Sequence, residues 1–416
     1  MYNSFEVLNK LYFVRTGGSN EELEAAKIIQ AECDKRNVLT TLESFEVDGY
    51  EIEQASLTFS DPSLQIECAG VGLSSSTTDD GITAEVIYVN SLDDAKVLQV
   101  KDKICLIHAK LVNYKLYKYL VEQHALGLIL CTGDVYKENN QVDLDPYMYR
   151  PRHYENGKIP AVCIRMKDAE KLINSLPQKA TIILKQKEMK KASHNVIATI
   201  EGTDLPGEVI AFTAHYDSVS YSKGAYDNAT GSTALLEFLS YFVNNCPKRT
   251  LKFIWCGSEE MGLVGSKNYV LMHESELSNY KLCINIDMIG VTIGYDHACV
   301  TGHSSLVSYL KYVSLEEGFG LNVRQGVYSS DSTSFADKGI PAISFARLSP
   351  SGGAVIHSRN DVLDHLSETN YYHTCSFIEK FASRLINAAY FPVDATMPDN
   401  MKEELDIYLG RKEKKE

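Results

Sequence analysis

Apolar residues form two different patterns along the chain, and the pattern changes near residue 190. Between about residues 50 and 190 the apolar segments are short and rich in β-branched residues, which is typical of strands. From about residue 194 onward, near-continuous apolar segments alternate with stretches of helical periodicity. The two patterns predict two units of different architecture within one chain.

The later pattern predicts an α/β unit. Near-continuous apolar segments are typical of strands that are covered on both faces. Helical stretches between such strands favour a mostly parallel, mixed central sheet with helices on both faces. The predicted strands are 196–200, 209–214, 251–256, 282–287 and 341–346, and the predicted helices are 229–245 and 304–318.

The earlier pattern predicts a β-rich segment. It contains one helix-like stretch, at 114–125, and a polar stretch at 132–159 that is expected to be a long surface loop. The predicted strands are 85–90, 103–109, 126–131, 160–165 and 180–185.

An amphipathic helix is expected near the N-terminus. Ser19 and Glu22 form the Ser-x-x-Glu pattern of a capping box. The residues that follow place Leu23, Ala26 and Ile29 on one face. Because such a helix fits the α/β unit, we interpret the β-rich segment as an insertion into that unit. The predicted parts are the α/β unit (1–49 and 190–395), the insertion (50–189) and a charged C-terminal tail (396–416).

The composition says little about the fold, but it argues against some classes of function. The chain has 416 residues, and its 44% hydrophobic and 23% charged residues are ordinary for a globular protein. Asp and Glu outnumber Lys and Arg by 55 to 41, so the formal net charge is −14. We therefore expect no binding to nucleic acid or to an anionic membrane surface, because phosphate contacts need clustered Lys and Arg. No apolar run approaches the ~20 residues of a membrane span, and no secretory signal is recognised at the N-terminus.

The cysteines indicate a reducing compartment. There are ten, none of them in a Cys-x-x-Cys pair, and several lie in apolar, strand-like segments. This usage is typical of buried, reduced thiols rather than of a disulfide framework. We expect a cytoplasmic protein.

Acidic residues and histidines follow the ends of the predicted strands. Such residues are costly to bury unless they are paired or bind a metal. The carboxyl ends of parallel strands meet at one edge of a sheet, so these side chains are expected to lie close together. Imidazole nitrogens and carboxylate oxygens are zinc ligands. The candidates are His215, Asp217, Asp227, Glu259, Glu260, Asp287 and His357.

The number of candidates suits two metal ions. One carboxylate would bridge the ions, and each ion would have one further carboxylate and one histidine. Two ions roughly 3.5–4 Å apart can hold a carbonyl oxygen and activate water. One carboxylate must remain unligated in order to take the proton from that water.

Five motifs together resemble the co-catalytic di-zinc aminopeptidase family. This family includes bacterial leucyl aminopeptidases, aminopeptidase Y and the glutamate carboxypeptidase type, and it belongs to clan MH. The resemblance covers roughly residues 194–370, and the order and spacing of the motifs agree. The motifs are HYD (215–217), GAYDNATG (224–231), SEEMGLVGS (258–266), NIDMIG (285–290) and IHSRND (356–361).

The insertion resembles the protease-associated (PA) domain that many members of this family carry. This resemblance rests on the strand pattern and on the segments KDKICLIHAK (101–110) and EQHALGLILC (122–131).

The resemblance implies a complete set of metal ligands for two zinc ions. Asp227 matches the bridging carboxylate. Glu260 and His357 would complete the first zinc site, and His215 and Asp287 would complete the second.

The resemblance also implies a mechanism. Glu259 matches the general base, which would activate a metal-bridging water, and Asp217 matches the acid that orients the ligand His215. The chain would then be a zinc-dependent exopeptidase, expected to be an aminopeptidase that removes N-terminal residues from peptides with a free N-terminus. Association into a homo-oligomer is left open.

The stabilising group for the oxyanion is not settled by the motifs. Tyr328 lies where some members place a tyrosine with this role, and Tyr226 is the alternative. Ser330, Asp331 and Ser332 resemble the family's Ser-Asp-His segment near the substrate, but Ser332 replaces the histidine.

Three alternatives remain open at this point. A glutaminyl cyclase of the same clan would use one zinc ion. A carboxypeptidase of the glutamate type would need arginines near the substrate, for which Arg324 and Arg347 are the candidates. A binding module without activity would lack ligands that this chain retains. Asp361, four residues after His357, would either orient that histidine or cap a turn.

Overall fold

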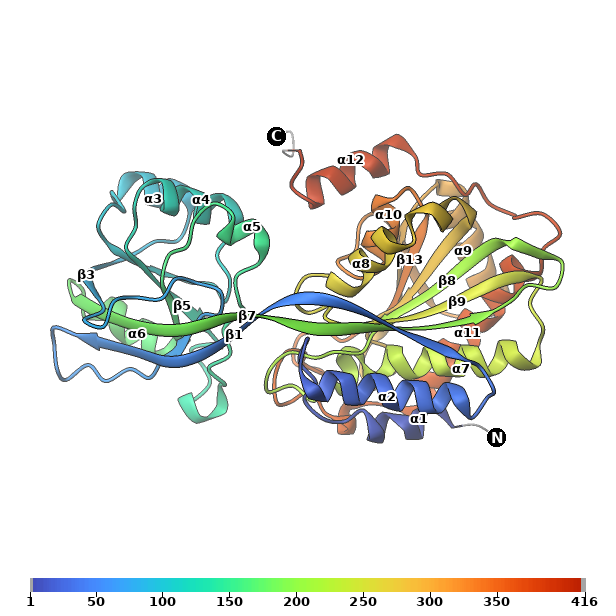
Figure 1. Cartoon of the computed structure of the whole chain (residues 1–416), viewed down its shortest axis with the longest axis horizontal. Coiled ribbons are helices and arrows are strands. Elements are labelled where there is room, and N and C mark those ends of the chain that lie inside the picture. The colour runs from blue at the N-terminus through green and yellow to red at the C-terminus, as the bar shows by residue number, and fades with distance from the viewer. Residues whose placement is uncertain (1–2, 413–416) are drawn as a thin grey trace. The chain divides into compact units, whose positions relative to one another are not determined.

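The computed structural model describes residues 3–412, which divide into two compact units (Figure 1). The larger unit comprises Met1–Val47 and Ala192–Glu416, and the smaller unit is Asp48–Lys191. The divisions fall inside two long strands, β1 (Thr40–Phe59) and β7 (Lys179–Ile200). The sequence placed the divisions at 49/50 and 189/190, two residues away in each case.

A mixed and mostly parallel sheet forms the centre of the larger unit. The strand order is β12-β11-β13-β10-β8-β9-β7. The four strands β9, β8, β10 and β13 run parallel to one another, whereas β11 is antiparallel to β13 and β7 to β9. The α/β fold that the sequence predicted is confirmed. The strand bounds are β8 Leu205–His215, β9 Arg249–Cys256, β10 Tyr280–Ile286, β11 Tyr295–Thr301, β12 Leu321–Gln325 and β13 Ala342–Leu348.

Helices cover both faces of this sheet, and the alternation of side chains along β8 shows why. Ile210 and Phe212 point into a core under α1, α2, α7, α9 and α11, whereas Val209 and Ala211 point into a second core under α8, α10 and α12. Figure 1 shows α7 and α8 on opposite sides of the strands. The helix bounds are α1 Ser4–Val7, α2 Asn20–Asp34, α7 Thr230–Asn244, α8 Val264–Met272, α9 Ser304–Glu316, α10 Ser332–Asp337, α11 Glu368–Asn387 and α12 Asp399–Tyr408.

Two strands of the larger unit have no apolar pattern in the sequence. Strand β12 is exposed along most of its length, and only Val323 is buried. Strand β11 buries Asp296 and His297 beside apolar residues, so its sequence lacks a continuous apolar run. The sequence pattern did not reveal β12 because an edge strand is largely exposed. It did not reveal β11 because buried polar residues interrupt its apolar run.

The prediction of a charged C-terminal tail over 396–416 is wrong for its described part. Helix α12 places Met401 and Leu405 in the core beside Phe335 of α10. Arg411 forms ion pairs with Asp337 and Asp406. The apolar residues, spaced four apart on one helical face, are buried despite the charged residues around them. The remaining residues, 413–416, lie outside the described part.

Helix α2 begins as predicted, but its cap differs from a capping box. Ser19 accepts a hydrogen bond from the backbone N–H of Glu22 at 3.0 Å. The Glu22 carboxylate does not return to Ser19; one of its oxygens accepts from the N–H of Gly18 at 2.7 Å. The other oxygen accepts from Ser193 and Ser258, so the side chain joins α2 to distant segments.

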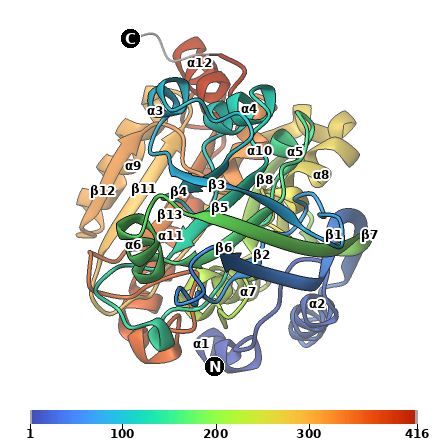
Figure 2. The same ribbon diagram turned by 90° about the vertical axis from the view of Figure 1, so that its left-hand side faces the viewer.

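Four parallel strands form the centre of the smaller unit (Figure 2). Its strand order is β7-β3-β4-β5-β6-β2, with antiparallel pairs at both ends. Helices α3 and α4 cover one face and α6 covers the other. The bounds are β2 Ala69–Gly70, β3 Ile82–Tyr88, β4 Ile104–Ile107, β5 Gly127–Thr132, β6 Ala161–Arg165, α3 Leu92–Val97, α4 Tyr114–Glu122, α5 Pro151–Tyr154 and α6 Met166–Asn174.

The segment 132–159 is not wholly a surface loop. Tyr149 is fully buried and His153 is 6% exposed, and both pack against Tyr117 of α4. Isolated aromatic residues within a polar stretch show no periodicity, so the sequence pattern concealed this contact.

All ten cysteines carry free thiols, and eight of them are buried. Between residues 3 and 412, no helix combines the length and apolar character that a membrane crossing requires.

Candidate metal centre

The carboxyl ends of the central strands bring the five predicted ligands together. His215 is the last residue of β8, and Asp287 follows β10 directly. Glu260 lies in the loop after β9, and Asp227 lies in the turn Ala225–Ala229 that leads into α7. His357 comes from the loop after β13. These elements are far apart in sequence, and only the order of strands in the sheet makes them neighbours.

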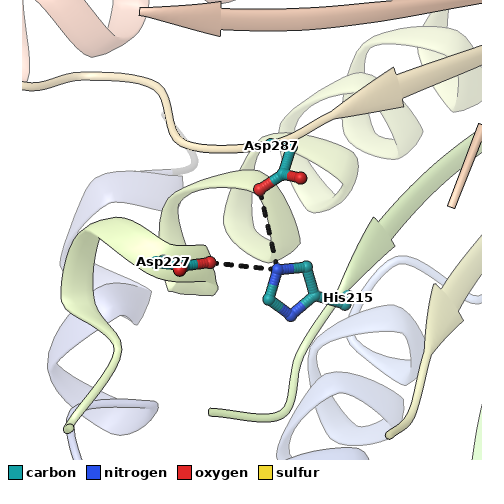
Figure 3. A group of neighbouring side chains, drawn as sticks. All are labelled: His215, Asp227 and Asp287. Atoms are coloured by element: carbon teal, nitrogen blue, oxygen red, sulfur yellow. Dashed lines mark ion pairs between the residues drawn. The ribbon is translucent and has the colours of Figure 1, made fainter. Parts of the chain in front are cut away.

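Three of these residues form a first group around one imidazole nitrogen. Nε2 of His215 lies 3.1 Å from Oδ1 of Asp227 and 3.6 Å from Oδ1 of Asp287. Figure 3 shows both carboxylates directed at this nitrogen. All three residues are buried.

The second group shares Asp227 with the first. Nε2 of His357 lies 3.0 Å from Oδ2 of Asp227 and 3.0 Å from Oε1 of Glu260. Asp227 thus directs one oxygen to each group. This is the arrangement expected of a carboxylate that bridges two cations.

The spacing of these atoms fits metal ligands. Ligands about 2.0–2.2 Å from a tetrahedral zinc ion lie about 3.3–3.6 Å from one another, and the four pairs above span 3.0–3.6 Å. Oε1 of Glu260 and Oδ1 of Asp287 are buried, and the groups that face them are the histidine nitrogens of His357 at 3.0 Å and His215 at 3.6 Å. Burying carboxylate oxygens is costly, and a cation in each group would offset that cost.

The charge of the site also calls for cations. Burial lowers the pKa of His357, but the carboxylates of Asp227 and Glu260 outweigh burial and raise this pKa to about 12. The pKa of His215 is likewise raised well above its ordinary value, because the surrounding carboxylates outweigh burial. Burial, reinforced by the carboxylate of Asp227, raises the pKa of Glu260 to about 7. The carboxylates therefore favour positive charge at both imidazoles, and divalent cations would supply that charge.

Asp217 connects His215 to the loop that carries the two glutamates. Its Oδ1 lies 3.4 Å from Nδ1 of His215. The same carboxylate accepts hydrogen bonds from the backbone N–H groups of Glu259 at 2.9 Å and Glu260 at 3.1 Å. Asp217 is fully buried. Its side chain therefore fixes the loop that carries the two glutamates relative to the loop that follows His215.

Glu259 directly precedes the ligand candidate Glu260 without itself belonging to either group. Among the described residues, the two candidate metal groups do not include it. Burial raises the pKa of its carboxyl group well above the ordinary value, and the carboxylates of Glu260, Asp331 and Asp287 add to this rise. A carboxylate with a raised pKa is suited to accept and return a proton near neutral pH.

The two candidate tyrosines differ in what their hydroxyl groups contact. The hydroxyl of Tyr226 donates a hydrogen bond to the backbone carbonyl of Arg347 and is thereby engaged. Burial and the nearby carboxylates of Asp287 and Asp227 raise the pKa of Tyr328, and its hydroxyl donates to no described residue. The hydroxyl of Tyr328 is therefore available as a donor near the carboxylates of Asp287 and Asp227.

Ser332, which replaces the expected histidine, belongs to a buried cluster of hydroxyl groups. Its Oγ lies 2.8 Å from that of Ser330, which in turn lies 2.7 Å from that of Ser344. Asn285, two residues before Asp287, donates to Ser344 at 2.9 Å. The cluster links Asn285 of β10 to Ser344 of β13.

Two further residues, Asn228 and Asp361, hold the ligand loops, a role that no sequence pattern indicates. The side chain of Asn228 accepts from the N–H of Met288 at 3.1 Å and donates to the carbonyl of Ile286 at 2.9 Å, so it grips the backbone on both sides of Asp287. Asp361 accepts from the N–H groups of Tyr226 at 2.7 Å and Asp227 at 3.1 Å. The sequence signal was only their adjacency to predicted ligands.

Comparison with known proteins agrees with this geometry. Residues 195–382 match the sequence profile of Peptidase family M28. Human carboxypeptidase Q is 28% identical over 269 residues, which cover 59% of this chain and 55% of carboxypeptidase Q, so the chain spans about half the length of this relative. Aminopeptidase YwaD of Bacillus subtilis is 27% identical over 383 residues, which cover 88% of this chain and 80% of that protein.

Solved structures show the same fold over nearly the whole chain. The aminopeptidase from Aneurinibacillus sp. strain AM-1 superposes with a TM-score of 0.76 at 23% identity, covering 94% of this chain and 95% of that one. The zinc aminopeptidase BSAP from Bacillus subtilis also gives 0.76, at 24% identity, covering 95% of this chain and 98% of that one. The resemblance indicated by the motifs is confirmed, since all five candidate ligands lie within the segment that matches peptidase family M28.

Proposed function

We propose that this chain is a zinc-dependent aminopeptidase that binds two zinc ions. The observation that carries the proposal is the bridging position of Asp227, whose two oxygens face His215 and His357 separately. His215 and Asp287 would complete one zinc site, and Glu260 and His357 would complete the other. When bound, zinc lowers the pKa of a coordinated water and polarises the scissile carbonyl.

The chain's own residues would then move protons and orient the substrate. Glu259 takes a proton from the attacking water and returns it to the leaving amine. Asp217 keeps Glu259 in place through the backbone hydrogen bond described above. Tyr328 donates a hydrogen bond to the carbonyl oxygen as negative charge develops on it. The carboxylates around the site favour a substrate whose α-amine is positively charged.

Two findings favour an aminopeptidase over the other members of the clan. Arg347, one of the two arginines that a glutamate-type carboxypeptidase would need, donates to Asp296 at 2.6 Å and to the carbonyl of Val291 at 2.8 Å. It is therefore engaged within the fold. The second group, with Glu260 and His357, supports two ions rather than the single ion of a glutaminyl cyclase.

The proposal includes three further points, which concern the smaller unit, the cellular location and the oligomeric state. We propose that the smaller unit is a PA-type insertion, which its strand pattern supports. Ten free thiols support a cytoplasmic location. Homo-oligomer formation remains open to measurement by light scattering.

The test is hydrolysis of a panel of aminoacyl p-nitroanilides by the zinc-loaded chain, with N-acetylated anilides as matched controls. We expect hydrolysis only where the amine is free. Glu259→Gln should retain two zinc ions and lose at least ~100-fold in turnover. Preferential cleavage of N-blocked peptides with a free carboxyl terminus, or activity with one zinc ion per chain, would contradict the proposal.

A further inference from the structure

Arg15 is a fully buried cation that lies outside the segment matched by the family profile. It precedes helix α2 and belongs to the N-terminal segment of the larger unit. Burying a guanidinium group is costly unless its N–H donors are satisfied. The carbonyl groups that accept from these donors show which segment the side chain holds.

The guanidinium group binds the loop that joins His215 to Asp227. It donates to the backbone carbonyl of Tyr216, to that of Lys223 at 2.6 Å and to that of Gly224 at 2.9 Å. These carbonyls stand at the two ends of the loop 216–224. One planar side chain therefore closes the loop across its ends, as a rigid fork of donors can do.

Backbone contacts reinforce the same connection. The N–H of Arg15 donates to Oγ of Ser218 at 3.1 Å, and the N–H of Ser218 donates to the carbonyl of Arg15 at 3.2 Å. The loop approaches so closely that a Cβ atom on Gly224 would lie 3.0 Å from Nη2 of Arg15. Gly224 also has a φ of +52°, which favours glycine.

The loop held by Arg15 carries the residue that positions the glutamates. Asp217 lies in this loop and accepts from the backbone of Glu259 and Glu260. The loop begins directly after the ligand His215, and the turn that contains Asp227 begins directly after Gly224. A shift of this loop would therefore displace ligands of both metal groups.

We propose that Arg15 is a positioning residue for the metal centre, acting through the loop 216–224. This inference rests on the proposed function, because it assumes that the two groups bind metal. Arg15 touches neither substrate nor metal. Partners that hydrogen-bond a ligand directly typically contribute 10–100-fold to metal affinity, and Arg15, one contact further from the ligands, is expected at the lower end of that range.

The side chain keeps its charge in this setting. Burial lowers the pKa of Arg15 to about 10, and the carboxylates of Asp217, Asp361 and Asp227 oppose that fall. The guanidinium is therefore protonated at neutral pH. Lysine at this position would preserve the charge but lose the fork, so it separates geometry from electrostatics.

The test measures zinc affinity by chelator competition and the visible absorption spectrum of the cobalt-substituted full chain. For Arg15→Lys we expect at least ~10-fold weaker zinc binding and an altered cobalt spectrum, with thermal unfolding still cooperative. The matched control is Arg249→Lys. Arg249 is equally buried and donates to the carbonyls of Leu385, Ile386 and Ala388, but it begins β9 at the end opposite the metal centre. Its variant should lower thermal stability and leave zinc affinity and the cobalt spectrum unchanged.

The outcomes distinguish this inference from the proposed function. If Arg15→Lys and Arg249→Lys bind zinc like the unaltered chain, the inference about Arg15 is overturned and the proposed function stands. If the unaltered chain binds no zinc, both are overturned. If Arg15→Lys does not fold, Ser218→Ala decides, because it removes the hydrogen bond that the N–H of Arg15 donates to the loop, together with the one that Ser218 donates to Ser222 within it. A zinc affinity of Ser218→Ala within twofold of the unaltered chain would overturn the inference.

Discussion

The two units bury histidines in opposite electrostatic settings. In the smaller unit His153 stacks on Tyr149, and its Nε2 contacts the backbone carbonyl of Val112 at 3.0 Å. Burial lowers its pKa. In the larger unit His215 and His357 face carboxylates, and their pKa values are raised in spite of burial. Burial by itself makes a histidine a neutral core residue, and carboxylate partners make it a potential ligand.

The same contrast holds for the two sheets. Both units contain four parallel strands whose carboxyl ends share an edge. Within residues 3–412, candidate metal groups occur only at the edge in the larger unit. A parallel sheet provides a place for a site, and the residues at the strand ends decide whether one forms.

The largest effect is expected from Asp227→Asn in the larger unit. Because Asp227 serves both groups, its loss should abolish binding of both zinc ions, and activity should fall to background. Zinc content of the purified variant, measured by mass spectrometry, checks this. His357→Ala is the matched control and should leave one ion bound. Retention of both ions by Asp227→Asn would contradict the bridging role.

A smaller effect is expected from Asn228→Ala, which changes no ligand. It removes the hydrogen bonds on both sides of Asp287, so zinc affinity should fall by about 10–100-fold. Chelator competition measures this change. Asn245→Ala is a suitable control, since Asn245 is exposed on the surface and its side chain donates a hydrogen bond to the carbonyl of Tyr241, away from the metal centre. Equal zinc affinities for the two variants would show that the loop is positioned by other contacts.

His153, the buried histidine of the smaller unit, should make the free energy of unfolding depend on pH. The ordinary pKa of histidine is 6.5, and burial lowers that of His153 in the folded chain. The unfolded chain therefore binds the proton more tightly, so stability is present above pH 6.5 and is lost as the pH falls below it. The protection factors of the amide hydrogens in the segment 149–159, which compare their exchange rates with those of an unfolded chain at the same pH, should fall between pH 7 and pH 5.

The variant His153→Gln should remove this fall in protection, because glutamine does not titrate. His108→Gln, which replaces an exposed histidine in the same unit, should leave it in place. An unchanged pH profile for His153→Gln would assign the effect to another group.

The smallest effect on stability is expected at Glu379, whose carboxyl group lies near the carboxylate of Glu237 and belongs to neither candidate metal group. Burial, with the nearby carboxylate of Glu237, raises the pKa of Glu379 from 4.5 to about 7. A raised carboxyl pKa means that the folded chain binds the proton more tightly, so this contribution to stability is present below pH 4.5 and is lost as the pH rises through 7. Glu379→Gln should therefore raise the melting temperature at pH 8.5 by a few degrees relative to the unaltered chain.

The gain should disappear at pH 5, where the native carboxyl group is protonated. Glu24→Gln, at an exposed position on α2, serves as the control and should change neither value. A gain for Glu379→Gln that is independent of pH would point to packing rather than to proton binding.

Much of the central sheet could be predicted because its strands are covered on both faces. Strands β8, β9 and β10 are nearly continuous apolar segments, and their ends carry the polar residues that mark the site. Strands β11 and β12 could not be found in this way, since one buries charged residues and the other lies at the edge. Helix α12 was missed because its few apolar residues are surrounded by charges.

The sequence by itself determined the chemistry available at the site. Residue type decides which atoms can bind a metal, and order along the chain placed His215, Glu260 and Asp287 at successive strand ends. The tertiary structure alone decided how these residues are held. Arg15, Asn228 and Asp361 act through backbone N–H and carbonyl groups, which all residue types except proline share. Hydrogen bonds to the backbone leave no pattern of residue types, so only the folded chain reveals which side chains position the ligands.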